Sequence, residues 1–197
     1  MKTTPDVRAQ HRRALAAASE AVAQVRAGDL SLPTPCGDWD LAGLLAHMIG
    51  QNLGFALAVS AGDAPESSYA APKVWPDELS TAWDRSADRV LAAFHDVELE
   101  REVRLVQVNA NGTFPAAVAI GMHLLDTVIH TWDVATSLGN PYRPDDDLVE
   151  IIATQASRVP AGSARTKPGS AFAPVITTTQ TDPWLTALAT LGRATPN

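Results

Sequence analysis

Hydrophobic residues recur at helical spacing in four long stretches of the chain, which predicts four main helices. The stretches are 6–27, Trp39 to about Ala61, Pro76–Phe94 and about Pro115–Ser137. Residue types at their ends support these limits. Asp38 is a typical N-cap residue, Pro76 suits a first helical turn, and Gly139 is a common C-terminal stop.

The remaining pattern predicts short elements only. Residues 97–112 lose the helical period and suggest a short extended stretch and a turn, which allows a small hairpin. Apolar residues return at helical spacing from Asp145 to about Arg158 and from Pro183 to Leu191. Turn-rich segments at 29–37 and 62–74 separate the first three helices. The sequence therefore predicts an all-α protein.

Composition narrows the class of protein. The chain has 197 residues, 46% of them hydrophobic, which is enough for the core of a single domain. One cysteine excludes an internal disulfide and fits a reducing, cytoplasmic location. The net charge of −7 without a basic cluster argues against nucleic acid as a partner. The N-terminus lacks the apolar core of a signal peptide, and no apolar run approaches the roughly 18 residues of a membrane span.

The fourth stretch carries the most informative polar residues. A helix advances about 100° per residue, so Asp126 and His130 stack on one face, and His123 lies within about 20° of His130. Their neighbours in the sequence are mostly aliphatic. Because burying a carboxylate and imidazoles is costly without a partner, a metal ion is the simplest explanation. Asp-x-x-x-His offers an oxygen and a nitrogen ligand one turn apart, which suits zinc, nickel or iron.

Further residues extend this candidate site. His47, in the middle of the second apolar helix, is the natural third ligand, and Gln51 one turn on is a candidate to support it. Asp133, three residues after His130, either accepts a hydrogen bond from the His130 ring or is an unrelated carboxylate. His123 lies nearly two turns from His130, about 10 Å along the axis, so one ion cannot easily contact both.

Other candidates receive a structural interpretation. Cys36 precedes the second helix, where a thiol can become reactive, but we interpret it as a small packing residue. His11, beside Arg12 and Arg13, is expected on the surface. The tryptophans expected to pack in the core, with one of them free to line a pocket, are Trp39, Trp83 and Trp132.

Two segments carry a family resemblance. TPCGDWDLAGLLAHMIGQN (Thr34–Asn52) and HLLDTVIHTWDVATSLG (His123–Gly139) resemble the DinB-like metal-binding superfamily. Within it they resemble the actinobacterial branch related to the N-terminal domain of mycothiol-dependent maleylpyruvate isomerase. The tail TDPWLTALATLGRATP is similar to the ending of small stand-alone members.

The resemblance implies an up-down-down-up four-helix bundle with one long crossover and short extra C-terminal helices. It implies a single DinB-like metal-binding domain over 1–197, with the bundle at about 5–140 and an extension at about 141–197. It also implies zinc or nickel held by His47, Asp126 and His130. Relatives often carry glutamate at the acid position, and aspartate is one methylene shorter. A homodimer is a further expectation, because such bundles often pair through helix faces.

Three functions follow from this set of ligands. The first, which the resemblance implies, is a transferase or isomerase in which the metal activates the thiolate of mycothiol, or a similar thiol, for attack on an electrophile. The second is a hydrolase that uses metal-bound water, with Asp133 or His123 as the base. The third is a bundle that binds metal without catalysis. The short chain argues against maleylpyruvate isomerase itself.

Overall fold

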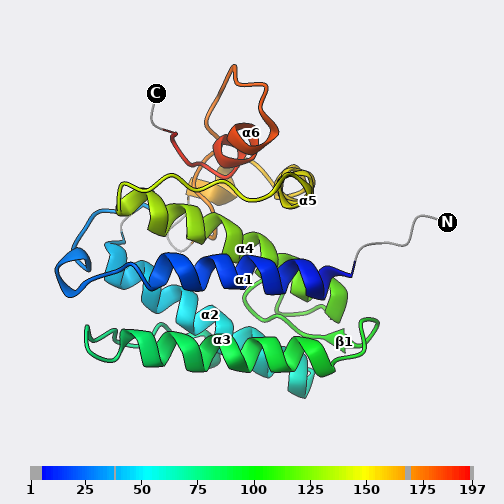
Figure 1. Ribbon diagram of the computed structural model, residues 1–197. Coiled ribbons are helices and arrows are strands. Elements are labelled where there is room, and N and C mark those ends of the chain that lie inside the picture. The colour runs from blue at the N-terminus through cyan, green and yellow to red at the C-terminus, as the bar shows by residue number, and fades with distance from the viewer. Residues whose placement is uncertain (1–5, 38, 167–169, 196–197) are drawn as a thin grey trace.

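The computed structural model describes residues 6–37, 39–166 and 170–195, and helices dominate it. Four of them form a bundle (Figure 1): α1 (Val7–Val22), α2 (Leu41–Ala61), α3 (Leu79–Asp96) and α4 (Ala116–Ser137). The predicted all-α, DinB-like bundle is confirmed. All four helices bury an aliphatic face in one core, which is the main reason they associate.

The helices are arranged so that sequence neighbours are not always spatial neighbours. Helix α1 packs on α3 and α4, and α2 packs on the same two helices, so α1 and α2 lie diagonally across the bundle. Figure 1 shows α2 and α3 running in the same direction, opposite to α1 and α4. This is the expected up-down-down-up order. It places α2 directly against α4, the two helices that carry the candidate ligands.

Parallel α2 and α3 require the chain to return along the bundle between them. This crossover includes the short 3-10 helix η2 (Glu66–Tyr69), which packs on α2. Two glycines of α2 allow the close approach. A Cβ atom on Gly50 would lie 2.6 Å from the Tyr69 carbonyl oxygen, and one on Gly54 would lie 2.2 Å from the Tyr69 ring.

A two-stranded hairpin fixes the start of α4. Strand β1 (Glu102–Val103) pairs antiparallel with β2 (Phe114–Pro115), and Val103 lies opposite Phe114. The first turn of α4 is also tied to this region, because the amide of Ala116 donates to the carbonyl of Arg101. The small hairpin that the sequence allowed is therefore present.

The C-terminal part of the chain covers the face of α4 that points away from the bundle. It contains α5 (Asp146–Ala156), the 3-10 helix η3 (Ser163–Thr166) and α6 (Pro183–Thr190). These elements build a second apolar cluster with α4. Its larger members are Leu124, Val128, Ile129, Trp132, Leu148, Ile152, Trp184 and Leu188. Helix α4 is thus enclosed on both sides, which explains why its sequence is apolar nearly all round.

The structure corrects several predicted helix boundaries. Helix α1 ends at Val22 rather than at residue 27, and a separate 3-10 turn, η1 (Ala27–Asp29), follows. Helix α2 begins after Asp40, whose carboxylate accepts a hydrogen bond from the Gly43 amide at 2.8 Å. Asp38, the predicted N-cap, lies outside the described residues. A nearby aspartate two positions later is an equally good cap, so residue type alone does not choose between them.

Helix α2 also corrects the expectation about apolar runs. Among the described residues it is long and apolar enough to cross a membrane by length and composition. However, 72% of its most apolar window is buried inside the bundle. A central helix of a bundle shows the same composition, because neighbours surround it on most sides.

Candidate metal centre

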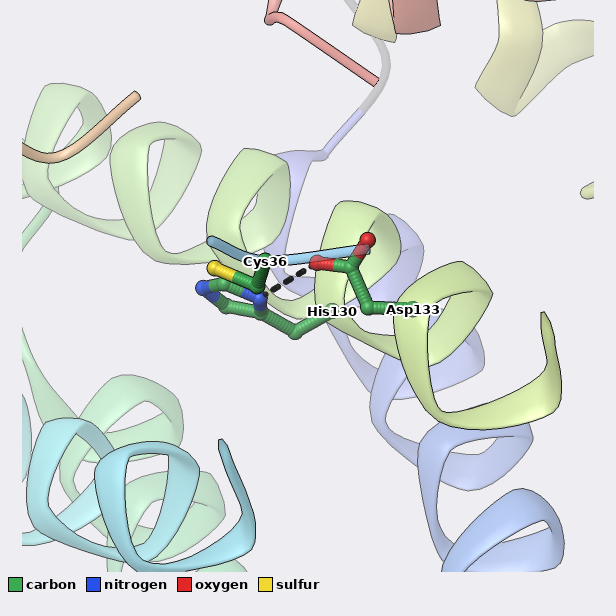
Figure 2. Close-up of side chains that lie close together, drawn as sticks. All are labelled: Cys36, His130 and Asp133. Carbon is green, nitrogen blue, oxygen red and sulfur yellow. Dashed lines mark hydrogen bonds and ion pairs between the residues drawn. The ribbon is translucent and has the colours of Figure 1, made fainter. Parts of the chain in front are cut away.

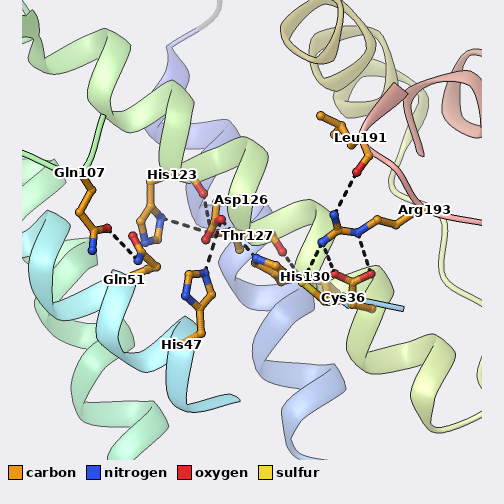
Figure 3. Close-up of polar contacts among 12 residues, drawn as sticks. Cys36, His47, Gln51, Gln107, His123, Asp126, Thr127, His130, Leu191 and Arg193 are labelled. Atoms are coloured by element: carbon orange, nitrogen blue, oxygen red, sulfur yellow. Dashed lines mark hydrogen bonds and ion pairs between the residues drawn. The ribbon is translucent and has the colours of Figure 1, made fainter. Parts of the chain in front are cut away.

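His47, Asp126 and His130 lie together between α2 and α4 (Figure 3). Each offers one ligand atom, and the three atoms lie within 4.8 Å of one another. Asp126 Oδ1 is 3.3 Å from His130 Nε2 and 3.8 Å from His47 Nε2. The structure therefore brings the three predicted residues into one cluster.

Burial differs across this cluster. The side chain of His130 is only 2% exposed, whereas those of His47 and Asp126 are 22% and 25% exposed. One side of the site is therefore packed into the protein, and the other faces solvent. His47 and Asp126 are therefore the two members of the cluster that contact solvent.

The charges in the cluster depend on one another. Burial alone would raise the pKa of Asp126, but His130 and His47 beside it outweigh that effect and hold its pKa well below the usual value. Burial likewise disfavours charge on His130, yet Asp126, Asp133 and Cys36 raise its pKa well above the usual value. Without metal, an imidazolium at His130 is thus balanced by carboxylates. A metal ion would replace the proton on Nε2, so binding would release a proton.

Asp133 fixes the orientation of His130. Its Oδ2 accepts a hydrogen bond from His130 Nδ1 at 2.9 Å, and its side chain is fully buried. This confirms the interpretation in which Asp133 supports the His130 ring. Because Nδ1 carries the proton, Nε2 is the nitrogen that faces His47 and Asp126, as a ligand should.

Arg193 completes this support from the C-terminal segment. Its guanidinium donates two hydrogen bonds to the Asp133 carboxylate, of 2.8 Å from Nη2 and 3.2 Å from Nε. Nη1 also donates to the Leu191 carbonyl. The side chains of Arg193 and Asp133 are almost fully buried. Burial alone would raise the pKa of Asp133, but the hydrogen bonds from His130 and Arg193 hold it below its usual value. Sequence reasoning missed Arg193, because 60 residues separate it from Asp133.

Cys36 is close to the same histidine (Figure 2). Its thiol, the His130 ring and the Asp133 carboxylate form a second group whose ligand atoms lie within 4.8 Å of one another. The Cys36 sulfur also accepts a hydrogen bond from Arg193 Nη2 at 3.2 Å. The interpretation of Cys36 as a packing residue is therefore incomplete. The sequence feature that could have indicated a role at the site was the place of Cys36 just before the second helix.

Trp39 forms an outer wall of the site. Its ring centre lies 4.6 Å from that of His47 and 6.4 Å from that of His130. The side chain is 38% exposed, so this tryptophan is not a core residue, although Trp83 and Trp132 are. Its expected place in the core is therefore wrong, and its ring lies against the candidate ligand His47 instead.

His123 is not part of the group formed by the three candidate ligands. Its Nδ1 lies 2.8 Å from Nε2 of His11, and both rings contact Phe94. His11 is only 1% exposed, so its expected place on the surface is wrong. The helical period gives the reason, since His11 lies on the same face of α1 as Leu15, Ala18 and Val22.

Gln51 forms its side-chain hydrogen bond with Gln107 rather than with His47. Its side-chain nitrogen instead donates to Gln107 Oε1 at 3.1 Å, which ties α2 to the segment between the two strands. The support of the site therefore comes from α4 and the C-terminal segment.

The chemistry of the first cluster fits a divalent metal ion. Two imidazoles and one carboxylate are a common ligand set for zinc and similar metals. His130 has a hydrogen-bonded carboxylate on its other nitrogen, as metal-binding histidines usually do. The partial exposure of His47 and Asp126 leaves room for a further ligand from solvent.

Comparisons with known proteins agree with this fold. The model of the mycothiol maleylpyruvate isomerase N-terminal domain matches residues 11–135. Two uncharacterized proteins of Mycobacterium tuberculosis, from strains CDC 1551 / Oshkosh and ATCC 25618 / H37Rv, are each 30% identical over 171 residues. The match covers 83% of this chain and 84% of each relative.

Solved structures of mycothiol-dependent maleylpyruvate isomerase share the architecture. A histidine-to-alanine mutant of that enzyme superposes with a TM-score of 0.59, and another structure of it with 0.56. In both cases the identity is 17%, and the match covers 76% of this chain and 68% of the other. With the family match over the bundle, these findings lead to one conclusion: the chain belongs to the mycothiol maleylpyruvate isomerase N-terminal domain family.

Proposed function

We propose that the protein binds a divalent metal ion, zinc or nickel, through His47, Asp126 and His130, and that it activates a small thiol such as mycothiol. The observation that carries this proposal is the cluster itself. Three ligand atoms of suitable chemistry lie within 4.8 Å, and one side is open to solvent. Three protein ligands with an open position are typical of catalytic rather than structural sites.

A divalent ion held there would lower the pKa of a bound thiol and so supply a thiolate at neutral pH. The protein's own residues have separate tasks. Asp133 holds the proton on Nδ1 of His130, which leaves Nε2 for binding. Trp39 shields one side of His47 and provides an apolar surface beside the open position.

The thiol proposal is favoured over hydrolysis by the environment of the two candidate bases. Asp133 is fully buried and paired with Arg193, so it is not free to take a proton from water. His123 is buried against His11 and two phenylalanines. A hydrolase would need a base that water can reach, whereas a bound thiol can lose its proton to solvent.

Elemental analysis of untagged protein tests the metal site. We expect near-stoichiometric zinc or nickel in the parent and loss of most of it in His47→Ala. His95→Ala is the matched control, because His95 is an exposed histidine at the end of α3. Equal metal content in the parent and His47→Ala would contradict the proposed ligands.

A second measurement tests the thiol. The protein is loaded with cobalt, whose absorption spectrum reports its ligands, and mycothiol is then added. We expect a new thiolate-to-cobalt absorption band. We also expect either thiol consumption with a panel of alkylating electrophiles or isomerisation of maleylpyruvate with the thiol regenerated. No spectral change, together with ester or lactone hydrolysis that chelation abolishes, would favour the hydrolase instead.

A further inference from the structure

Two candidate metal-binding groups share one histidine. His130 belongs both to the group with His47 and Asp126 and to the group with Cys36 and Asp133. Thiolate, imidazole and carboxylate together are a strong ligand set for zinc, so the second group is chemically as suitable as the first. Something other than donor type must therefore decide which side of His130 receives the ion.

Arg193 occupies the second group. Its Nη2 lies 2.8 Å from Asp133 Oδ2 and 3.2 Å from the Cys36 sulfur, so one nitrogen bridges both side chains. Figure 3 shows Arg193 beside Cys36. The guanidinium is permanently charged and only 1% exposed. A metal cation entering between Cys36 and Asp133 would meet this buried positive charge at short range, with little solvent to screen it.

The backbone holds Arg193 firmly in this place. Helix α6 ends at Thr190, and Gly192 adopts a left-handed φ of 78° that turns the chain inward. The amide of Arg193 then donates to the Leu188 carbonyl at 2.8 Å. The position of the guanidinium is thus set by the end of a helix rather than by a mobile side chain alone.

We propose that Arg193 is a positioning residue that directs the metal ion to Nε2 of His130. It does so by holding Asp133 against Nδ1 of His130. Its guanidinium also occupies the space between Cys36 and Asp133, where it would repel a metal ion. This inference rests on the proposed function, since it assumes that the His47 side binds metal. It adds that the C-terminal segment selects the site and keeps the Cys36 thiol out of it.

Cobalt titration of the full chain tests this assignment through affinity and absorption. In the parent we expect cobalt to bind without a thiolate band from the protein. In Arg193→Gln we expect affinity to fall at least tenfold and a thiolate-to-cobalt band to appear. The added change Cys36→Ser should remove that band, which would identify the sulfur. A purely structural role for Arg193 would not move the ion toward a thiol.

Matched variants separate this effect from loss of stability. Arg165→Gln removes another buried arginine of the C-terminal region, whose bonds go to backbone carbonyls such as Pro160 and Val159. It should lower the melting temperature but keep the cobalt affinity and spectrum of the parent. Arg193→Lys keeps the charge without the forked contact, so it should bind more weakly yet show no thiolate band.

The outcomes distinguish the two proposals. A parent that binds no cobalt would overturn the proposed function. A parent that binds cobalt, with Arg193→Gln unchanged in affinity and spectrum, would overturn only the role of Arg193. A thiolate band already present in the parent would also overturn it. If Arg193→Gln does not fold, parent-like affinity in Arg193→Lys would contradict the role of the forked contact.

Discussion

His11 and His123 show how burial sets the charge of single residues in this bundle. Desolvation lowers the pKa of His123 to about 4, and it lowers that of His11 well below the usual value. Charge on His123 further lowers the pKa of His11. For His123, the charge of Asp126 raises the pKa and that of His47 lowers it. The ring nitrogens of His11 and His123 lie 2.8 Å apart. At neutral pH both are therefore uncharged, with one ring donating the hydrogen bond and the other accepting it.

This pair predicts a loss of stability in mild acid. The unfolded chain takes up a proton on His123 below about pH 6.5, whereas the folded protein resists protonation until about pH 4. The unfolded state therefore binds more protons in this window, and the free energy of unfolding falls as pH drops through it. From the shift of His123 alone we expect the free energy of unfolding to fall by on the order of 3 kcal/mol across this window.

Urea denaturation with chelator present, at several pH values between 7 and 4, measures this effect. The double variant His11→Leu/His123→Leu should lose clearly less stability across the window than the parent. His95→Ala, which changes an exposed histidine, should follow the parent curve. Parallel curves for the parent and the double variant would show that the pair does not cause the acid sensitivity.

At the scale of elements, the hydrophobic period was sufficient to locate the helices, whereas their arrangement as a bundle was expected from the family resemblance. It located all four bundle helices, α5 and α6, and the helix ends moved by only a few residues. The period could not show that the crossover lies against α2. That contact depends on the absence of a side chain at Gly50 and Gly54, not on apolar residues. In the sequence these glycines look like ordinary weak points of a helix.

Gly54→Ala should therefore destabilise the protein although alanine favours helices. The added Cβ would lie 2.2 Å from the buried Tyr69 ring, and relieving that overlap should cost about 1–3 kcal/mol. Gly121→Ala is the control in α4, since its Cβ would meet only the flexible end of Gln155 at 3.3 Å. It should be neutral or stabilising by up to about 1 kcal/mol. Thermal denaturation of both variants gives the comparison, and equal effects would argue against a tight crossover.

At the scale of the whole molecule, the candidate site joins parts of the chain that are distant in sequence. The spacing of Asp126 and His130 could be interpreted from a single helix, and His47 became the expected third ligand only because that pair was present elsewhere in the chain. For Asp133 the sequence left two interpretations open, a hydrogen bond to the His130 ring or an unrelated carboxylate. Arg193 and the second group around Cys36 could not be inferred, because nothing local to a short irregular segment indicates a buried ion pair with α4.

Truncation at the C-terminus tests how far the bundle depends on that ion pair. Removal of residues 193–197 leaves Asp133 buried without its guanidinium, which should cost about 3–5 kcal/mol. Removal of residues 195–197 keeps Arg193 and should have little effect. Denaturant unfolding of the two shortened proteins beside the parent measures the difference. Similar stability of both would mean that the pair contributes little.

The buried contact between Arg193 and Asp133 also has a consequence for biosynthesis. Of the residues that orient His130, Arg193 is the last to be translated, 60 residues after its partner. While helix α6 is still being translated, Asp133 lacks this counter-charge. The site therefore reaches its final geometry only after Arg193 has been translated and has left the ribosome. An incomplete chain would differ from the finished one in how it handles metal as well as in its stability.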